Sequence, residues 1–131
     1  MTKKEFLTYE LAVELKKLGF GESCFGYYTV DEVLNFDSLK MFKGSDLTTL
    51  TSQSDWTTLA PLWQQAFDWF REKYKLHGWV VPYFTLVGIN YSYLIMDENM
   101  RNLEDEVDVG TYQEARKACL EKLIEIVEKV S

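Results

Sequence analysis

Hydrophobic residues recur every three or four positions in three stretches of the chain, and this spacing predicts three helices. The first covers residues 8–18, where Leu11 and Leu15 fall on one side. Gly19 follows at the position where helices commonly end in a left-handed residue. Phe20 is then placed to fold back onto Leu15, as in a Schellman ending. The pattern therefore predicts both the extent of this helix and the way it ends.

The second stretch is the most strongly patterned part of the chain and runs from Pro61 to Tyr74. Pro61 suits the first helical position, because the amide proton that it lacks would be unpaired there anyway. A broad apolar stripe faces one way, and a smaller apolar edge lies on its flank, formed by Leu62, Trp69 and Leu76. This edge is covered either by residues 31–59 or by a partner protein or second copy, and the pattern leaves both alternatives open.

The third helix is introduced by a capping box. Thr111 can accept a hydrogen bond from a free helix amide while Glu114 reaches back to the amide of Thr111. Apolar residues then recur at helical spacing as far as Val130. We expect this helix to pack across a sheet.

Strand patterns lie between the helices. Residues 24–30 are rich in aromatic and β-branched residues, and Gly26 indicates a bulge or a close backbone approach. Residues 79–84 and 91–96 are predicted to pair as two strands joined by a loop. Pro82 cannot donate to a ladder, so its strand should lie at an edge or carry a bulge.

Two segments show no sustained period. Residues 31–59 are expected to form an irregular surface excursion, and residues 97–110 an acidic loop. The order is therefore helix, strand, helix, strand, strand, helix. This order predicts a single α+β domain over residues 1–131, in which three helices pack a small antiparallel sheet of about three strands.

The composition of the chain argues against nucleic-acid binding and against a membrane protein. The net charge is −7, and an acidic chain is poorly suited to bind nucleic acid, because that binding depends on Lys and Arg neutralising phosphates. No apolar run reaches the length of a membrane span, and the N-terminus shows no signal-peptide core. We therefore expect a cytoplasmic protein that does not associate with a membrane. Its two cysteines, Cys24 and Cys119, should be buried free thiols.

Four segments of the sequence together resemble a known group of proteins. They are residues 9–20 (YELAVELKKLGF), 24–28 (CFGYY), 60–74 (APLWQQAFDWFREKY) and 111–127 (TYQEARKACLEKLIEIV). The group consists of small proteins encoded by phages and prophages of gut bacteria, and it carries no established activity. The resemblance implies a phage setting and supplies no catalytic residue. In such sequences the position of Lys75 is often Gly, which implies a strained left-handed turn in this chain.

The sequence contains few groups of residues that could carry out catalysis or bind a metal ion. His77 is the single histidine and follows a helix end, where capping the last carbonyls is the more ordinary role. A Cys24–His77 nucleophile pair stays an alternative, although Cys24 lies in a strand pattern and not at a helix N-terminus. The acids of residues 104–108 lack the spacing of a calcium loop and indicate a solvated segment. We expect no catalytic residue, no metal and no cofactor.

Two hypotheses follow from these observations. The first is a non-enzymatic accessory module that binds a protein partner or itself through the edge of the second helix and the acidic loop. The second is a small-ligand or hydrolytic domain with Cys24 or His77 as its polar group and an aromatic pocket lined by Tyr27, Trp79, Tyr83, Tyr91 and Tyr93. A nucleic-acid mimic is a third interpretation, and it rests on negative charge alone.

Overall fold

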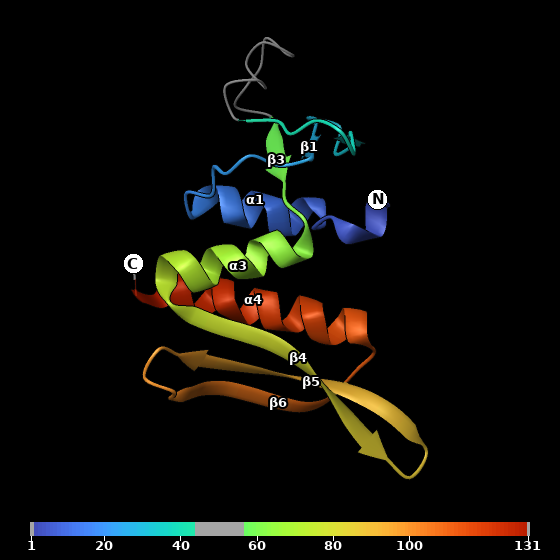
Figure 1. Cartoon of the computed structure of the whole chain (residues 1–131), viewed down its shortest axis with the longest axis vertical. Helices are drawn as coiled ribbons and strands as arrows, with labels where there is room; N and C mark the ends of the chain where they lie inside the picture. Colours follow the sequence, from blue (N-terminus) through green and yellow to red (C-terminus); the bar gives the residue numbers. More distant parts are fainter. Residues whose placement is uncertain (1, 44–56, 131) are drawn as a thin grey trace. The chain divides into compact units, whose positions relative to one another are not determined.

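The computed structural model describes residues 2–43 and 57–130, with only the backbone of residues 106–108. The chain divides into two compact units, Met1–Ala66 and Phe67–Ser131. Figure 1 shows the elements in chain order from blue to red. They form an α+β protein with two antiparallel sheets of three strands each. The predicted fold class is confirmed, whereas the prediction of one sheet and the predicted order of elements were inexact.

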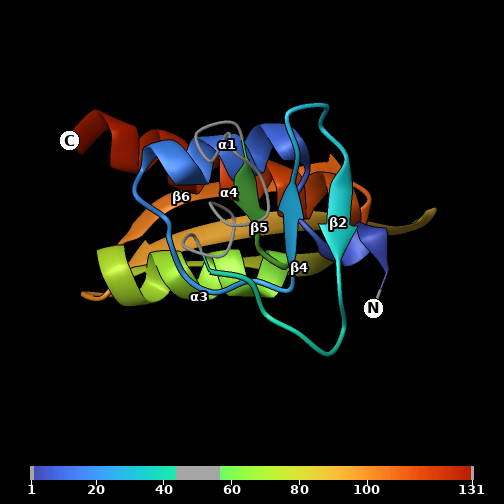
Figure 2. The same cartoon turned by 90° about the horizontal axis from the view of Figure 1, so that it is seen from above.

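The first unit holds a sheet in the order β2-β1-β3 (Figure 2). Its strands are β1 (Gly26–Tyr28), β2 (Leu34–Phe36) and β3 (Thr58–Ala60), and β1 pairs antiparallel with both neighbours. A short 3-10 helix, η1 (Lys3–Glu5), and the helix α1 (Tyr9–Lys17) precede the sheet. The hydroxyl of Tyr28 donates to the carbonyl of Leu7 at 2.6 Å, which ties the sheet to the segment before α1.

The predicted first helix and its ending are confirmed. The hydroxyl of Thr8 accepts from the amide of Leu11 at the start of α1. Gly19 has a φ of 98°, which is left-handed, and the amide of Phe20 donates to the carbonyl of Leu15 at 3.0 Å. This bond from the second residue past the cap is the one that a Schellman ending requires.

Gly26 sits where the backbone is approached closely, as its place in the strand pattern predicted. A Cβ atom there would lie 3.0 Å from the carbonyl oxygen of Asn35 and 3.0 Å from the ring of Phe6. Any larger side chain would have to push a paired strand aside. Glycine at this position therefore allows β2 and the η1 segment to close over β1.

The expected irregular segment 31–59 contains β2 and the first two residues of β3. β2 and β3 were missed because each is three residues long, which is too short for alternation to show. Residues 57–60 are all buried. Residues 44–56 of the predicted excursion lie outside the described residues.

The second unit holds a meander in the order β4-β5-β6. Its strands are β4 (Leu76–Thr85), β5 (Gly88–Asp97) and β6 (Asn102–Gly110). β4 and β5 form the predicted hairpin, and both strands are longer than expected. β4 is an edge strand, as Pro82 predicted. The expected acidic loop 97–110 is instead largely β6, because pairing with β5 supplies order that the charged sequence did not reveal.

The helix α3 (Trp63–Tyr74) contains the division between the units. It begins two residues later than predicted, because Leu62 is held extended by a bridge to Phe6. The carbonyl of Pro61 accepts from the amide of Leu7 at 2.9 Å, so Pro61 precedes the helix. At the other end Lys75 has a φ of 59°, and the predicted left-handed turn is confirmed.

The helix α4 (Tyr112–Val130) closes the chain and packs along the sheet of the second unit (Figure 1). Its capping box is confirmed. The amide of Glu114 donates to the Thr111 hydroxyl at 3.1 Å, and the amide of Thr111 donates to the Glu114 carboxylate at 3.2 Å. These two bonds lower the pKa of Glu114 below its ordinary value.

Candidate interaction surface

The pairing of β4 with β5 assigns their side chains to two opposite faces of the sheet. Gly78 identifies the face that α4 covers. A Cβ atom on Gly78 would lie 3.0 Å from the sulfur of Cys119 and 3.1 Å from Cδ1 of Leu123, both on α4. We call this side of the sheet the covered face.

The covered face is a conventional core. Gly78 is opposite Ile95, and Val80 is opposite Tyr93 in the ladder. Ile95 is completely buried, and Tyr93 is 6% exposed. The buried residues of α4 that supply this unit's core are Ala115, Cys119, Leu120, Leu123, Ile124 and Val127.

The other side of the hairpin is what we call the open face. Its members alternate with those of the covered face and are His77, Trp79, Val81 and Tyr83 of β4 and Asn90, Ser92, Leu94 and Met96 of β5. Trp79 is 44% exposed and Tyr83 is 43% exposed. Figure 1 shows α4 along one side of the sheet and no other described element of this unit along the opposite side. Large apolar side chains therefore lie on a sheet face that the rest of the unit leaves uncovered.

The hairpin ends in an exposed apolar turn, beyond the part of the sheet that β6 supports. The residues that we call the hairpin tip are Phe84, Leu86, Val87 and Ile89, and Leu86 and Val87 are almost fully exposed. β6 does not support this end, because its pairing with β5 begins at Tyr91. The Thr85 hydroxyl donates to the carbonyl of Gly88 at 2.9 Å and closes the turn. The tip is therefore an ordered two-residue turn with apolar side chains where polar turn residues are usual.

The hairpin carries no formal charge. Residues 76–96 contain no Asp, Glu, Lys or Arg, in a chain with 14 basic and 21 acidic residues. Asp105 of β6 lies beside the open face, where it is opposite Leu94. Charged residues are depleted at the centres of protein interfaces, because a charge buried there loses its hydration. The composition of this surface is that of an interface centre.

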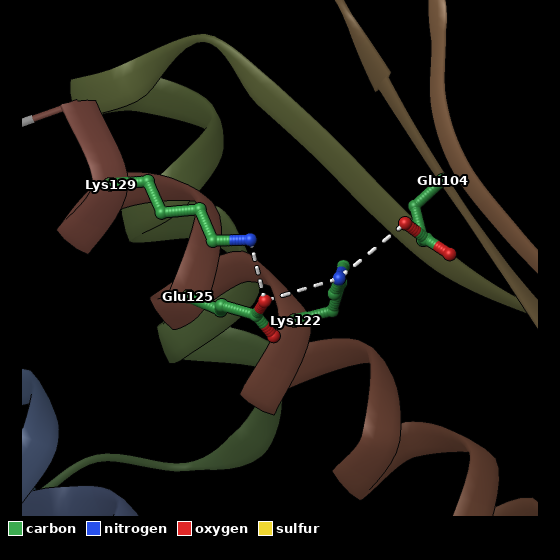
Figure 3. Close-up of polar contacts among 4 residues, drawn as sticks. All are labelled: Glu104, Lys122, Glu125 and Lys129. Atoms are coloured by element: carbon green, nitrogen blue, oxygen red, sulfur yellow. Dashed lines mark hydrogen bonds and ion pairs between the residues drawn. The ribbon is translucent and has the colours of Figure 1, made fainter.

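Ion pairs are found elsewhere in the unit. Lys122 of α4 lies 3.6 Å from the carboxylate of Glu104 on β6 and 3.4 Å from that of Glu125, which also contacts Lys129 at 2.9 Å (Figure 3). The hydrogen bond to Glu125 raises the pKa of Lys122. The bond from Lys129, followed by that from Lys122, lowers the pKa of Glu125. This network links α4 to β6 and includes no residue of the open face.

Both cysteines are buried free thiols, as predicted. Burial raises the pKa of Cys24 to about 12, and the Cys24 thiol donates to the carbonyl of Glu22 at 3.3 Å. Burial also raises the pKa of Cys119 to about 12. Because the thiolate is the nucleophile, neither group is set up to react near neutral pH.

His77 does not cap a helix. It is the second residue of β4, half-buried, and opposite Met96. The prediction of a capping role was wrong because β4 begins at Leu76, directly after the left-handed Lys75. Cys24 belongs to the first unit and His77 to the second.

The predicted edge of the second helix is not an exposed surface. Trp69 is 5% exposed, Leu76 is 7% exposed, and Leu62 is half-buried. The Trp69 ring packs edge-on against Phe70 and Tyr74, with the ring centroids 5.1 Å and 5.5 Å apart. The helical projection placed these residues correctly beside the stripe but could not show that their neighbours cover them.

The five residues of the predicted aromatic pocket do not converge. Trp79 and Tyr83 lie on the open face, whereas Tyr91 and Tyr93 lie on the covered face. Tyr27 belongs to the first unit, where its ring packs edge-on against Phe42. Alternation along paired strands, which separates neighbours in sequence onto opposite faces, divides the proposed lining.

Sequence reasoning missed Val81, Leu94, Met96 and the hairpin tip as surface residues. The signal that could have identified them is the uncharged run of residues 76–96, together with a turn that lacks polar residues.

Within residues 2–43 and 57–130, no three His, Cys, Asp or Glu side chains are grouped so that they could hold a metal ion. None of the helices in this described part combines the length and apolar character needed to cross a membrane. Comparisons of the chain with protein-family models, curated proteins and solved structures found no match.

Proposed function

We propose that this chain is a non-enzymatic accessory module, cytoplasmic and of phage or prophage origin, that acts by binding a protein through the open face and the hairpin tip. The observation that carries the proposal is Trp79, a large ring 44% exposed on a sheet face without charged residues on β4 or β5. The phage setting rests on the resemblance of residues 9–20, 24–28, 60–74 and 111–127 to phage-encoded proteins.

The composition of the open face supports a binding role. An antiparallel sheet with one solvated face ordinarily alternates apolar residues toward the core with polar residues toward water. Here the outward positions hold Trp79, Val81 and Tyr83 on one strand and Leu94 and Met96 on the next. Soluble monomers rarely expose large contiguous apolar patches, and such patches often mark sites where a protein binds a partner.

The type of partner follows from the same residues. Nucleic acid would require Lys or Arg to neutralise phosphates, and the hairpin offers neither. Trp and Tyr are the residue types that most often dominate protein interfaces, because each buries a large rigid area at little entropic cost. A protein surface with apolar pockets is therefore the occupant that this face suits.

The lack of an activated nucleophile among the described residues favours binding over catalysis. The two thiols are protonated near neutral pH and buried, and His77 is held in a strand. No observation favours the alternative of a ligand-binding or hydrolytic domain, because Trp79 and Tyr83 of its aromatic lining lie on the opposite face of the sheet from Tyr91 and Tyr93.

Photo-crosslinking in cells tests the proposal. A photoreactive phenylalanine derivative replaces Tyr83 on the open face, and a matched variant carries it at Leu39, which is 94% exposed in the first unit. We expect a protein adduct from position 83 and none from position 39. Equal labelling at both positions, or no adduct at position 83, would contradict the proposed function.

A further inference from the structure

We infer that the occupant of the open face is a second copy of this chain, packed face to face about a two-fold axis that passes near Val81. This inference rests on the proposed function and names its partner. The distribution of charge and the self-complementarity of the face support it.

The distribution of charge on the chain favours a second copy over a basic partner as the occupant of the open face. Each copy carries a net charge of −7, so two copies repel one another wherever their charged surfaces meet. The uncharged stretch 76–96 is the surface on which they can approach without facing like charges. A basic partner would gain nothing from a neutral face, because its charges would be desolvated there without a counter-charge.

The open face is also self-complementary. Trp79 and Tyr83 stand on the same side of β4, two positions before and two positions after Val81. A two-fold axis across the strand at Val81 reverses the second strand, so Trp79 of one copy meets Tyr83 of the other. Val81 and the small Ser92 opposite it lie between the rings and leave the centre lower than both ends. Ridges at the ends and a low centre allow the two faces to interlock.

The available area allows a contact smaller than a standard interface. β4 and β5 each have ten residues, so the hairpin is about 33 Å long, and with β6 the sheet is about 14 Å wide, which gives roughly 460 Å² of flat area per copy. This is a little more than half of the roughly 800 Å² per partner of a standard interface, so we expect association that depends on concentration.

Edge pairing of two β4 strands is the competing geometry, and Pro82 disfavours it. Proline within a strand is placed where its missing amide faces away from the neighbouring strand. The free edge of β4 therefore lacks a donor near its middle, which is a common protection against edge-to-edge association. The open face is therefore better suited to self-association than the free edge of β4.

Sedimentation equilibrium of the full chain tests the inference. We expect the mass to approach twice the 15.4 kDa of the monomer at micromolar concentrations. Trp79→Glu should weaken association at least tenfold, because it places a carboxylate from each copy in the interface. Leu39→Glu, a matched change at an exposed apolar residue of the first unit, should leave the association unchanged.

A second variant leaves the rings intact. Val81→Cys should link two copies through a short bis-maleimide, because packed sheets lie about 10 Å apart. Glu121→Cys, at an exposed position of α4, serves as the control and should link far less. Crosslinking at Val81 no greater than at Glu121 would overturn the inference even if Trp79→Glu failed to fold.

The remaining outcomes distinguish the inference from the proposed function. A monomer at every concentration, with a different protein crosslinked at position 83 in cells, overturns the second copy and leaves the proposed function standing. A monomer without any adduct overturns both. Flotation of the chain with phosphatidylcholine vesicles, lost in Trp79→Glu and kept in Leu39→Glu, would replace the second copy with a lipid surface.

Discussion

The two faces of the β4-β5-β6 sheet are made by the same strands and differ in what covers them. On the covered face, Gly78 has no side chain because Cys119 and Leu123 occupy the space that one would need. On the open face, the adjacent Trp79 is 44% exposed. Neighbouring positions of one strand thus serve opposite purposes.

This difference shows that apolar content alone does not locate a core. Both faces of the hairpin are uncharged, yet α4 buries one of them and no described element of the second unit lies on the other. The covered face should therefore account for stability and the open face for binding. Substitutions on and near the two faces test this division, and their expected effects range from several kcal/mol down to a fraction of one.

Leu123→Ala and Trp79→Ser compare the two faces directly. Leu123 is completely buried against Gly78, so its truncation should lower the free energy of unfolding by about 2–5 kcal/mol. Trp79→Ser should lower it by about 1 kcal/mol or less, because the ring is already half in solvent. Urea denaturation measures both. Similar losses from the two variants would mean that the open face also belongs to the core.

Gly78→Ala probes how tightly α4 closes on the sheet. The new methyl group would press on Cys119 and Leu123, which should lower the free energy of unfolding by about 1–3 kcal/mol. Gly21→Ala is the matched control, because the nearest atom to a Cβ there is 4.0 Å away. The control should change stability by less than about 0.5 kcal/mol. Equal losses of stability for the two variants in thermal denaturation would show that α4 leaves room for a methyl group at Gly78.

The buried Cys119 thiol should make the fold sensitive to alkali. Its pKa is about 12 in the folded chain and 9.0 in an ordinary environment, so the unfolded chain loses this proton first. The contribution is complete below pH 9 and declines as pH rises toward 12, by up to about 1.4 kcal/mol per pH unit.

Urea denaturation between pH 8 and about 11 checks this expectation against Cys119→Ala. The variant should lose stability less steeply with rising pH than the original chain, whatever its stability at pH 8. Parallel curves for the two proteins would show that the thiol is not protected by burial.

Lys75→Gly should stabilise the chain slightly. Lys75 has a φ of 59°, where a side chain costs about 1 kcal/mol and glycine does not. The greater freedom of glycine in the unfolded chain offsets part of this gain, so a net increase of roughly 0.5 kcal/mol is expected. Glu72→Gly, at an exposed position inside α3, is the contrasting variant and should destabilise by about 1 kcal/mol. A loss of stability in Lys75→Gly, measured by urea denaturation, would show that the lysine side chain contributes more than its strain costs.

Local signals predicted the helices and their ends well. Gly19 and the capping box of Thr111 and Glu114 act through neighbours in sequence, so the sequence alone displays them. The left-handed turn at Lys75 was implied by the family resemblance. Pro82 identified an edge strand for the same reason.

Elements that depend on distant partners were not predicted. β3 is three residues long and is made by pairing with β1, and β6 is ordered by β5 although its sequence is acidic. The sequence also left open whether the edge at Trp69 is buried, and it did not show that the residues of the predicted aromatic pocket lie on opposite faces. Burial and strand register decide which side chains are exposed, and neither can be derived from residue type.

Hydroxyl-radical footprinting in cells, compared with the purified chain at high dilution, tests the central claim most directly. If a protein occupies the open face, oxidation of Trp79 and Tyr83 should be several-fold slower in cells, while that of the exposed Leu39 changes little. Equal rates for Trp79 in the two states, relative to Leu39, would show that the open face stays in water and would contradict the account.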